Sequence, residues 1–418
     1  SLKVFKGVDC MKAEELMREA AEIAQEINAW REYLHAHAET GFALTKTLPY
    51  VKSELEKMGY APKSCGRAGL VVLAGGKKPG RTFLLRADMD ALPIREQSGV
   101  AFASETGCMH ACGHDLHTAM LLGAARLLKA HEEELAGTVK LMFQPAEEIF
   151  EGSADMIRAG VLEHPQVNAA LMIHVMAGMP FEPGTVIVSD PGVSAPAADY
   201  FEIRVRGKGC HGSMPNMGVD PLTAAAQILI ALQEIPAREL AMNDRAILTV
   251  GTMQAGTAAN AIPDEAVMKG SLRTFDEDVR ATVKQRMTDI ATGIAAAFRA
   301  GAEVTFGSGC PTLKNDSTLS ADAFRYGQEL LGEGRIYTVA QLKQESGSGG
   351  ASGSAGSEDF AYVSQAVPSV MLALAAGQPT KGYVYPQHHP KVTFDPAALA
   401  PGTAVYAYTA LRWLEDHA

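Results

Sequence analysis

The feature that most constrains the fold is a series of short, almost uninterrupted apolar runs that alternate with stretches of helical periodicity. The runs occur within 68–90, within 138–148 and at 169–175, and the stretch at 115–130 has apolar residues at helical spacing. Strands that are apolar on both faces are typical of a parallel sheet covered by helices on both sides. The sequence therefore predicts an α/β fold with a mostly parallel sheet.

A different order of predicted elements begins near Tyr200. A strand, a helix, two strands, a helix and a strand follow one another, which is the β-α-β-β-α-β order of a ferredoxin-like unit. The first pattern resumes after about Cys310, and 418 residues exceed what one hydrophobic core usually serves. We therefore predict a discontinuous catalytic domain at 1–190 and 308–418, with a smaller α+β domain inserted at 191–307.

Composition limits the partners and the compartment. The formal charge of −11 and the lack of a basic stripe argue against a nucleic-acid partner, and no apolar run reaches membrane-spanning length. Residues 12–36 predict one amphipathic helix rather than a secretory signal, and the six cysteines lack the spacing of a disulfide framework. The expectation is a protein of the reducing cytoplasm that contacts no membrane.

The segment MHACGHDLHTAM holds the densest group of metal-binding residue types. Cys112 and His114 lie two apart, directly before the predicted helix, so a thiolate and an imidazole can face one ion. An ordinary structural interpretation stays open at this point. In that case His114 and Asp115 cap the helix, and Cys112 is a small buried hydrophobe.

Two carboxylates follow a predicted strand in the segment QPAEE. Adjacent side chains diverge at a strand end, so one of Glu147 and Glu148 can bind metal while the other acts as general base toward water. An isolated Glu-Glu pair is more often a solvated acidic turn.

Two further histidine positions, His174 at a strand end and one of the pair at 388–389, complete a candidate set. Each alone is more often structural than a ligand. Ligands of parallel sheets bind at the carboxyl ends of strands, where Asp88, His174 and both glutamates at 147–148 fall. Thiolate, imidazole and carboxylate together suit Zn²⁺, Mn²⁺, Co²⁺ or Ni²⁺ rather than Ca²⁺ or Mg²⁺, and five ligands exceed one tetrahedral shell. Two ions that share a hydroxide are the economical inference.

The motifs of the chain resemble those of a known enzyme family. In order they are LLRADMDALPI, MHACGHDLHTAMLLGAA, FQPAEE, HGSMPNMGVDP, ANAIPD, GSLRTF, GSEDFAYV and HHPKVTF. They resemble the hippurate hydrolase and auxin-conjugate (IAA-amino acid) hydrolase branch of the aminoacylase-like metallopeptidases, over nearly the whole chain. The resemblance implies a cytoplasmic amidohydrolase that uses a binuclear metal site, with Zn or Mn first and Co or Ni as alternatives. Its substrates would be hippurate, N-acetyl amino acids or other small N-acyl amino acids.

The resemblance also implies residue roles. Glu147 would act as general base on a metal-bound water and later as acid, and Cys112 would bridge the ions. The implied metal ligands are Cys112, His114, Glu148, His174 and His388.

The inserted domain resembles the family's lid and dimerisation domain. The resemblance implies a homodimer in which His211 of CHGSMP reaches the partner subunit's active site and stabilises the oxyanion. Asn260 and Arg273 would hold the oxyanion or the carboxylate of the substrate. The ordinary alternatives are a turn residue for His211 and for Asn260, and a solvated strand charge for Arg273.

Some positions depart from the family pattern, namely Asn216, Met176 and Cys210, and these leave the acyl group undetermined. Two other functions stay open: a dipeptidase or aminopeptidase on the same scaffold, and a non-catalytic metal-binding homologue. The Gly/Ser-rich stretch at 346–357 is expected to form a flexible loop. Four further histidines are interpreted as structural or as supports of the ligands: His35, His37, His110 and His117.

Overall fold

The computed structural model describes residues 7–346 and 356–418, and its chain forms two compact units. The first unit contains residues up to 194, 314–346 and 362–418, and the second contains 195–313 and 356–361. Most of the Gly/Ser-rich stretch predicted to be a flexible loop lies outside the described residues.

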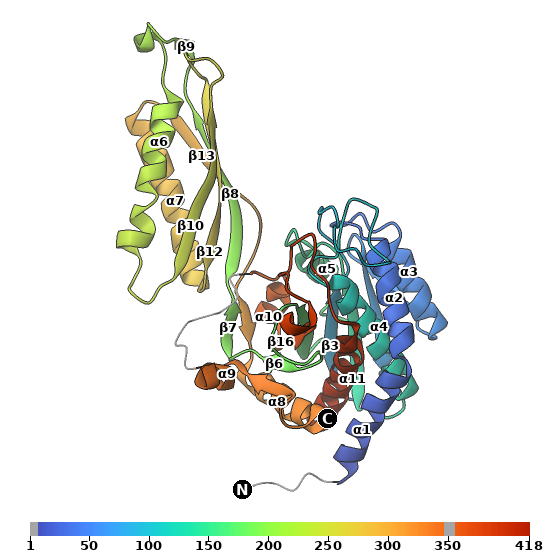
Figure 1. Ribbon diagram of the computed structural model, residues 1–418. Coiled ribbons are helices and arrows are strands. Elements are labelled where there is room, and N and C mark those ends of the chain that lie inside the picture. The colour runs from blue at the N-terminus through green and yellow to red at the C-terminus, as the bar shows by residue number, and fades with distance from the viewer. Residues whose placement is uncertain (1–6, 347–355) are drawn as a thin grey trace. The chain divides into compact units, whose positions relative to one another are not determined.

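An eight-stranded sheet runs through the first unit in the order β1-β2-β4-β3-β5-β16-β6-β15 (Figure 1). The central strands β4, β3, β5 and β16 are mutually parallel, as are β6 and β15, whereas β1, β2 and the β16–β6 pair are antiparallel. The strands are β1 (Lys63–Cys65), β2 (Gly69–Gly75), β3 (Arg81–Asp88), β4 (Gly137–Gln144), β5 (Ala169–Met176), β6 (Val186–Val188), β15 (Ile336–Thr338) and β16 (Ser369–Ala375), with a separate pair of β7 (Gly192–Ala195) and β14 (Leu313–Asn315).

Helices cover both faces of this sheet because its central strands are apolar on both faces. In β3 every residue after Arg81 is buried. The helices α4 and α11 pack against β3 on one face, and α5 packs against β4 on the other (Figure 1). The predicted mixed α/β fold is confirmed. The helices are α1 (Gly7–Glu22), α2 (Ala24–Ala36), α3 (Thr47–Lys57), α4 (His114–Ala130), α5 (Gly152–Arg158), α8 (Ser317–Leu331), α9 (Val339–Ser346), α10 (Ala361–Ala366) and α11 (Leu399–Asp416).

The predicted single helix at 12–36 is wrong, since the chain turns at Ile23 between α1 and α2. The helix α1 packs on α8 and α11, whereas α2 packs mainly on α4. One straight helix could not bury its apolar residues against both neighbours.

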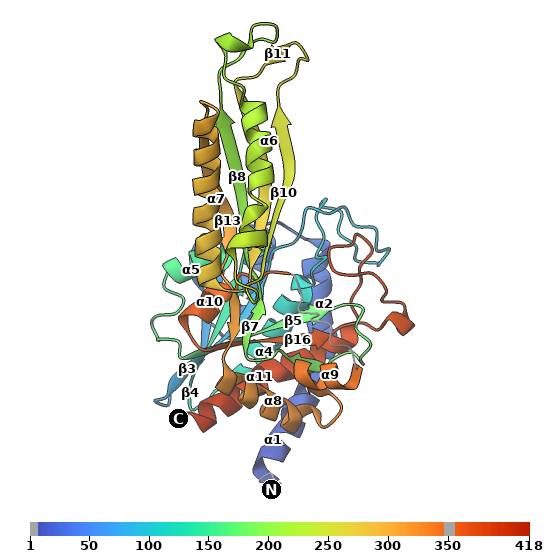
Figure 2. The ribbon, with the colours of Figure 1, turned by 90° about the vertical axis from the view of Figure 1, so that its left-hand side faces the viewer.

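The second unit has a four-stranded antiparallel sheet in the order β10-β12-β8-β13, with α6 and α7 packed against it (Figure 2). Asp220 caps α6 and Asp276 caps α7 through hydrogen bonds from backbone N–H groups. The predicted β-α-β-β-α-β order is present. The elements are β8 (Ala197–Arg206), β9 (Cys210–His211), α6 (Pro221–Ala231), β10 (Ala246–Ala255), β11 (Ala261–Ile262), β12 (Glu265–Thr274), α7 (Glu277–Ala297) and β13 (Gly301–Cys310).

None of the described helices is both long enough and apolar enough to cross a membrane.

Candidate metal centre

The carboxyl ends of three adjacent strands carry the candidate ligands of the first unit. In the sheet register, Asp88 at the end of β3 lies opposite Gln144 at the end of β4, and β3 also pairs with β5. Glu147 and Glu148 follow β4 directly, and His174 lies near the end of β5. The parallel pairing therefore brings side chains from distant parts of the sequence to one edge.

The five predicted ligands and Glu147 come together in three overlapping groups. In each group the ligand atoms lie within 4.8 Å of one another. The Cys112 Sγ lies 3.5 Å from His174 Nε2, and Glu148 Oε1 lies 3.8 Å from the Nε2 atoms of both His114 and His388. The three groups are Cys112–His114–His174, Cys112–Glu148–His388 and His114–Glu147–Glu148.

Backbone carbonyls fix the orientation of two of these histidines. His114 Nδ1 donates to the Asp90 carbonyl at 2.8 Å, and His174 Nδ1 donates to the Val175 carbonyl at 2.8 Å. In each ring the other nitrogen, Nε2, is then the one available as an electron-pair donor. His114 Nε2 is buried without a hydrogen-bond partner, which is the environment expected of a metal ligand. The donor set therefore fits a divalent metal ion.

His117 lies beside the cluster but has no nitrogen left for a metal. Its Nδ1 donates to Asp88 Oδ1 at 2.6 Å, and its Nε2 accepts from the Val175 N–H at 2.9 Å. The Arg86 guanidinium donates to the other Asp88 oxygen at 2.7 Å. Although burial alone would raise it, the pKa of Asp88 is held well below its usual value by His114, Arg86 and His117. Asp88, Arg86 and His117 thus form a closed buried network behind the ligands.

Asp90 is the residue of this site that the sequence reasoning missed. Its two carboxylate oxygens accept from the backbone N–H groups of Glu147, at 2.9 Å, and Glu148, at 3.2 Å. Its backbone carbonyl also accepts the hydrogen bond from His114 Nδ1. One residue thereby joins the loop after β3 to the loop after β4 and to the start of α4. The sequence signal that could have identified Asp90 is its place as the second aspartate of the DMD segment, directly after a strand.

Backbone conformation also adapts to the cluster. Ala146, just before the glutamates, has φ 55°, and His388 has φ 65°, both in the left-handed region that non-glycine residues rarely adopt. Gly113 separates Cys112 from His114 with φ 91°, and a Cβ there would lie 2.3 Å from Val175 Cγ2. Only glycine allows the thiol and the imidazole to approach β5 in this way.

The electrostatics of the cluster favour a bound cation. Burial raises the pKa of the Cys112 thiol to about 12, with the Glu148 carboxylate adding to the shift. Burial, with His114 and His174 nearby, lowers the pKa of His388. A thiol in this setting becomes a thiolate only beside a strong positive charge, such as a divalent metal ion.

The remaining predicted residues lie in the second unit. His211 on β9 pairs with Ala261 on β11, the neighbour of Asn260, so both predicted side chains lie on one exposed ribbon. His211 Nδ1 accepts from the Ser213 N–H at 3.1 Å, which leaves Nε2 as the donor of the neutral ring. Arg273 lies near the end of β12, whereas the ribbon of His211 and Asn260 adjoins the start of that strand. The strand rise between these two ends is about 30 Å. It donates to Ser357 Oγ at 2.7 Å. Within this unit Arg273 is therefore not brought together with His211 and Asn260.

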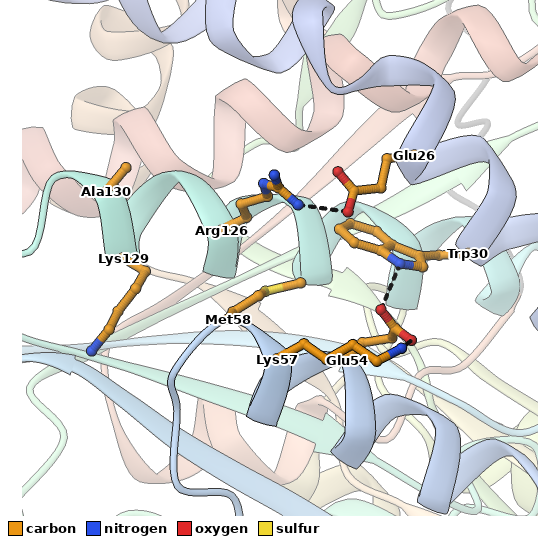
Figure 3. Close-up of a pocket in the computed structure, with 8 residues that line it drawn as sticks. All are labelled: Glu26, Trp30, Glu54, Lys57, Met58, Arg126, Lys129 and Ala130. Atoms are coloured by element: carbon orange, nitrogen blue, oxygen red, sulfur yellow. Dashed lines mark hydrogen bonds and ion pairs between the residues drawn. The ribbon is translucent and has the colours of Figure 1, made fainter.

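A cavity of about 330 Å³ between α2, α3 and α4 holds none of the predicted site residues (Figure 3). Its charged groups satisfy one another, since Arg126 binds Glu26 at 2.5 Å, Lys57 binds Glu54 at 2.6 Å, and Trp30 Nε1 donates to Glu54 at 3.1 Å. Lys129, the remaining charged residue of the lining, pairs with Glu132 at 2.8 Å. Each charged side chain of the lining therefore already has an oppositely charged partner.

Comparison with known proteins gives matches over most of the chain. Residues 84–412 match the family described as peptidase family M20/M25/M40. The N-acetylcysteine deacetylase of Bacillus subtilis (strain 168) is 35% identical over 92% of this chain and 96% of that protein. The N-acyl-L-amino acid amidohydrolase of Geobacillus stearothermophilus is 40% identical over 72% of this chain and 80% of that protein. A dinuclear metal-binding peptidase of the M20 family from Bacillus subtilis has a similar structure, with a TM-score of 0.76 and 33% identity, covering 94% of this chain and 99% of that one.

Proposed function

Since the chain belongs to peptidase family M20/M25/M40, we propose that it is an amidohydrolase that cleaves the amide bond of small N-acyl amino acids. Membership of the family confirms the resemblance that the motifs indicated. The observation that carries the proposal is the convergence of thiol, imidazole and carboxylate donors at one sheet edge, with the carboxylate of Glu147 beside them. This is the residue chemistry that metal-assisted hydrolysis of an amide requires.

The proposed metal ligands are Cys112, His114, Glu148, His174 and His388. Cys112 is the common member of the groups Cys112–His114–His174 and Cys112–Glu148–His388, which together contain all five proposed ligands, and this supports its assignment as the ligand shared by two ions. Two divalent ions, with Zn²⁺ or Mn²⁺ first as the family resemblance implies, would polarise the amide carbonyl and lower the pKa of water.

Glu147 is the proposed general base. Its carboxylate lies 3.9 Å from His114 Nε2 and is buried, while its N–H is fixed by Asp90. The carboxylate takes a proton from water as the water oxygen bonds to the amide carbon. The same proton then passes to the leaving nitrogen as the C–N bond breaks, which yields a carboxylic acid and an amino acid.

The second unit is the proposed lid and dimerisation domain, and it contains all but the first four residues of the stretch 191–307 that the sequence predicted for this domain. Strand β10 lies at an edge of its sheet and exposes Ile247 and Met253, so a second copy can continue the sheet there. In such a homodimer the Nε2–H of His211, with Asn260 on the same ribbon, would stabilise the oxyanion in the partner subunit's site. Arg273, at the other end of β12, is the proposed anchor for the substrate carboxylate.

The test measures metal content and hydrolysis for wild type, Glu147→Gln and the control Glu151→Gln. Glu151 is an exposed glutamate that pairs with Arg67 at 3.4 Å and touches no ligand. We expect Glu147→Gln to keep its metal and to lose activity by about 10²-fold or more, and Glu151→Gln to match wild type. The substrate panel contains hippurate, N-acetyl amino acids and simple dipeptides. Faster cleavage of dipeptides would replace the proposal with a dipeptidase, and metal binding without any cleavage would indicate a binding protein.

A further inference from the structure

A buried network of charged side chains lies directly behind the candidate ligands in the first unit. Asp115, in the first turn of α4, accepts from Arg31 Nε at 2.8 Å and from His35 Nδ1 at 2.8 Å, both on α2. The other His35 nitrogen, Nε2, donates to Glu96 at 3.0 Å and 3.1 Å. The side chains of Arg31, His35, Asp115 and Glu96 are at most 5% exposed.

The pKa values of Glu96 and Asp115 are both lowered, and with both carboxyls ionised the geometry requires His35 to be an imidazolium. Each ring nitrogen faces a carboxylate oxygen, so each must carry a hydrogen to donate. A neutral ring would set a nitrogen lone pair against one of the two buried carboxylates, which is a costly arrangement in a low-dielectric interior. The network therefore holds two cations, Arg31 and His35, against two anions, Asp115 and Glu96.

These contacts join α2 to the two segments that carry Cys112 and His114. Asp115 follows His114 in the chain, so the bond to His35 fixes the start of α4 where that ligand lies. Glu96 belongs to the long connection at 89–113, which contains Cys112 next to its last residue, and its carboxylate also accepts from the Ser104 N–H at 2.7 Å. The Phe102 ring of the same connection packs on Arg31 at 4.5 Å and edge-on to His35 at 5.3 Å.

We propose that His35 is a positioning residue that, by joining Asp115 to Glu96 as an imidazolium, sets the Cys112–His114 pair in the geometry that binds metal. This inference rests on the proposed function, because it assumes that the pair holds the ions. His35 lies on the amphipathic helix α2 and contacts none of the ligands, so its role is to support residues that do. Loss of such a support typically weakens metal binding rather than the fold alone.

The charges around His35 also predict that the metal affinity of the protein depends on pH. Asp115 faces the ring from α4, Glu96 from the 89–113 connection and Arg31 from its own helix, while the His110 ring lies 6.2 Å away. Burial and Arg31 lower the pKa of His35, but the two carboxylates outweigh them and raise it to about 9. The stabilising contacts of the His35 imidazolium are therefore fully present below pH 6.5, the ordinary pKa of histidine. They are lost as the pH rises through the raised pKa of about 9.

The experiment compares wild type, His35→Gln, Glu96→Gln and the control His37→Gln. His37 sits at the end of the same helix, but it donates only to the Tyr33 carbonyl and stacks on that ring. Purified apo-protein is titrated with Zn²⁺ against a competing chelator at pH 7, and its melting temperature and circular dichroism report folding. We expect His35→Gln to bind Zn²⁺ about 10–100-fold more weakly and Glu96→Gln to show a smaller loss, while His37→Gln matches wild type.

A second readout is the pH dependence of the same titration. The ratio of the Zn²⁺ affinities of wild type and His35→Gln should shrink as the pH rises above about 9, because wild type then loses its imidazolium. A lowered melting temperature with unchanged Zn²⁺ affinity and an unchanged pH profile would overturn the positioning role. If His35→Gln does not fold, the Glu96→Gln titration decides the question by the same criterion. Wild type that binds no Zn²⁺ would overturn the proposed function itself. Normal Zn²⁺ binding by every variant would overturn only the positioning role of His35.

Discussion

The two units hold their candidate functional residues in different ways. In the first unit His114 and His174 are fixed through one nitrogen by backbone carbonyls, and Asp90 ties both glutamates to the same edge. In the second unit His211 and Asn260 are exposed on a two-stranded ribbon, and Arg273 lies at the other end of the sheet. The first arrangement brings its candidate residues together within one unit, whereas the second leaves His211 and Asn260 exposed and apart from Arg273.

Removal of metal should have the largest effect, and it tests whether the first unit is the chemical centre. We expect dialysis against a chelator to abolish hydrolysis of N-acyl amino acids, and added Zn²⁺ or Mn²⁺ to restore it, because the proposed reaction uses water activated by the bound ions. The Cys112 thiol cannot replace that water, since burial raises its pKa to about 12 and keeps it protonated. Activity that survives chelation, with metal content measured below one ion per ten chains, would contradict this.

Substitution of His211 should have the next largest effect, and it tests whether the second unit depends on assembly. We expect His211→Ala to keep its metal and to lose about 10²–10³-fold in kcat, as for a lost oxyanion donor. Mixing it with an equal amount of Glu147→Gln under conditions of subunit exchange should restore about a quarter of wild-type activity. About half of the dimers are then mixed, and one of the two sites in each mixed dimer is intact. No recovery in dimers shown by light scattering to have exchanged would place His211 in its own chain's site.

Asp90→Asn should have an intermediate effect, and it tests how far the first unit is preorganised. The amide keeps the shape of the side chain but offers one acceptor oxygen where Glu147 and Glu148 require two. We expect metal affinity or activity to fall by about 10–100-fold while the melting temperature changes little. An equal loss in Asp316→Asn, a helix cap of α8 in the same unit, would show that the effect is general destabilisation.

The smallest effect concerns His131, at the periphery of the first unit. Burial lowers its pKa, but hydrogen bonds with Glu134 and Glu19 outweigh burial and raise it. The contribution of this site to stability is therefore present below pH 6.5 and is lost as the pH rises through the raised pKa. We expect His131→Gln to lower the free energy of unfolding at pH 6 by at most about 1 kcal/mol, and by less at pH 9. Urea unfolding at both pH values checks this sign.

Several features of the site could be predicted from local sequence because they are local in the chain. Cys112 and His114 are two residues apart, Glu147 and Glu148 are adjacent, and each pair borders an element with a clear hydrophobic period. The β-α-β-β-α-β order of the second unit follows from the same periodicity. His35 was interpreted as structural or as a support of the ligands, but its partner Asp115 and the role of Asp90 were not predicted. A hydrogen bond between residues 57 or 80 positions apart leaves no periodic trace in the sequence.

The sequence alone determined most of the order of elements, though not the break between α1 and α2, and the chemical types of the candidate ligands. Hydrophobic period and residue chemistry are properties of short segments. Only the tertiary structure decided which nitrogen of His114 and of His174 is available, that His117 is closed to metal, and that Arg273 lies far from His211. The physical reason is that these outcomes depend on distances across the parallel sheet and along β12, and chain folding sets those distances after the local elements have formed.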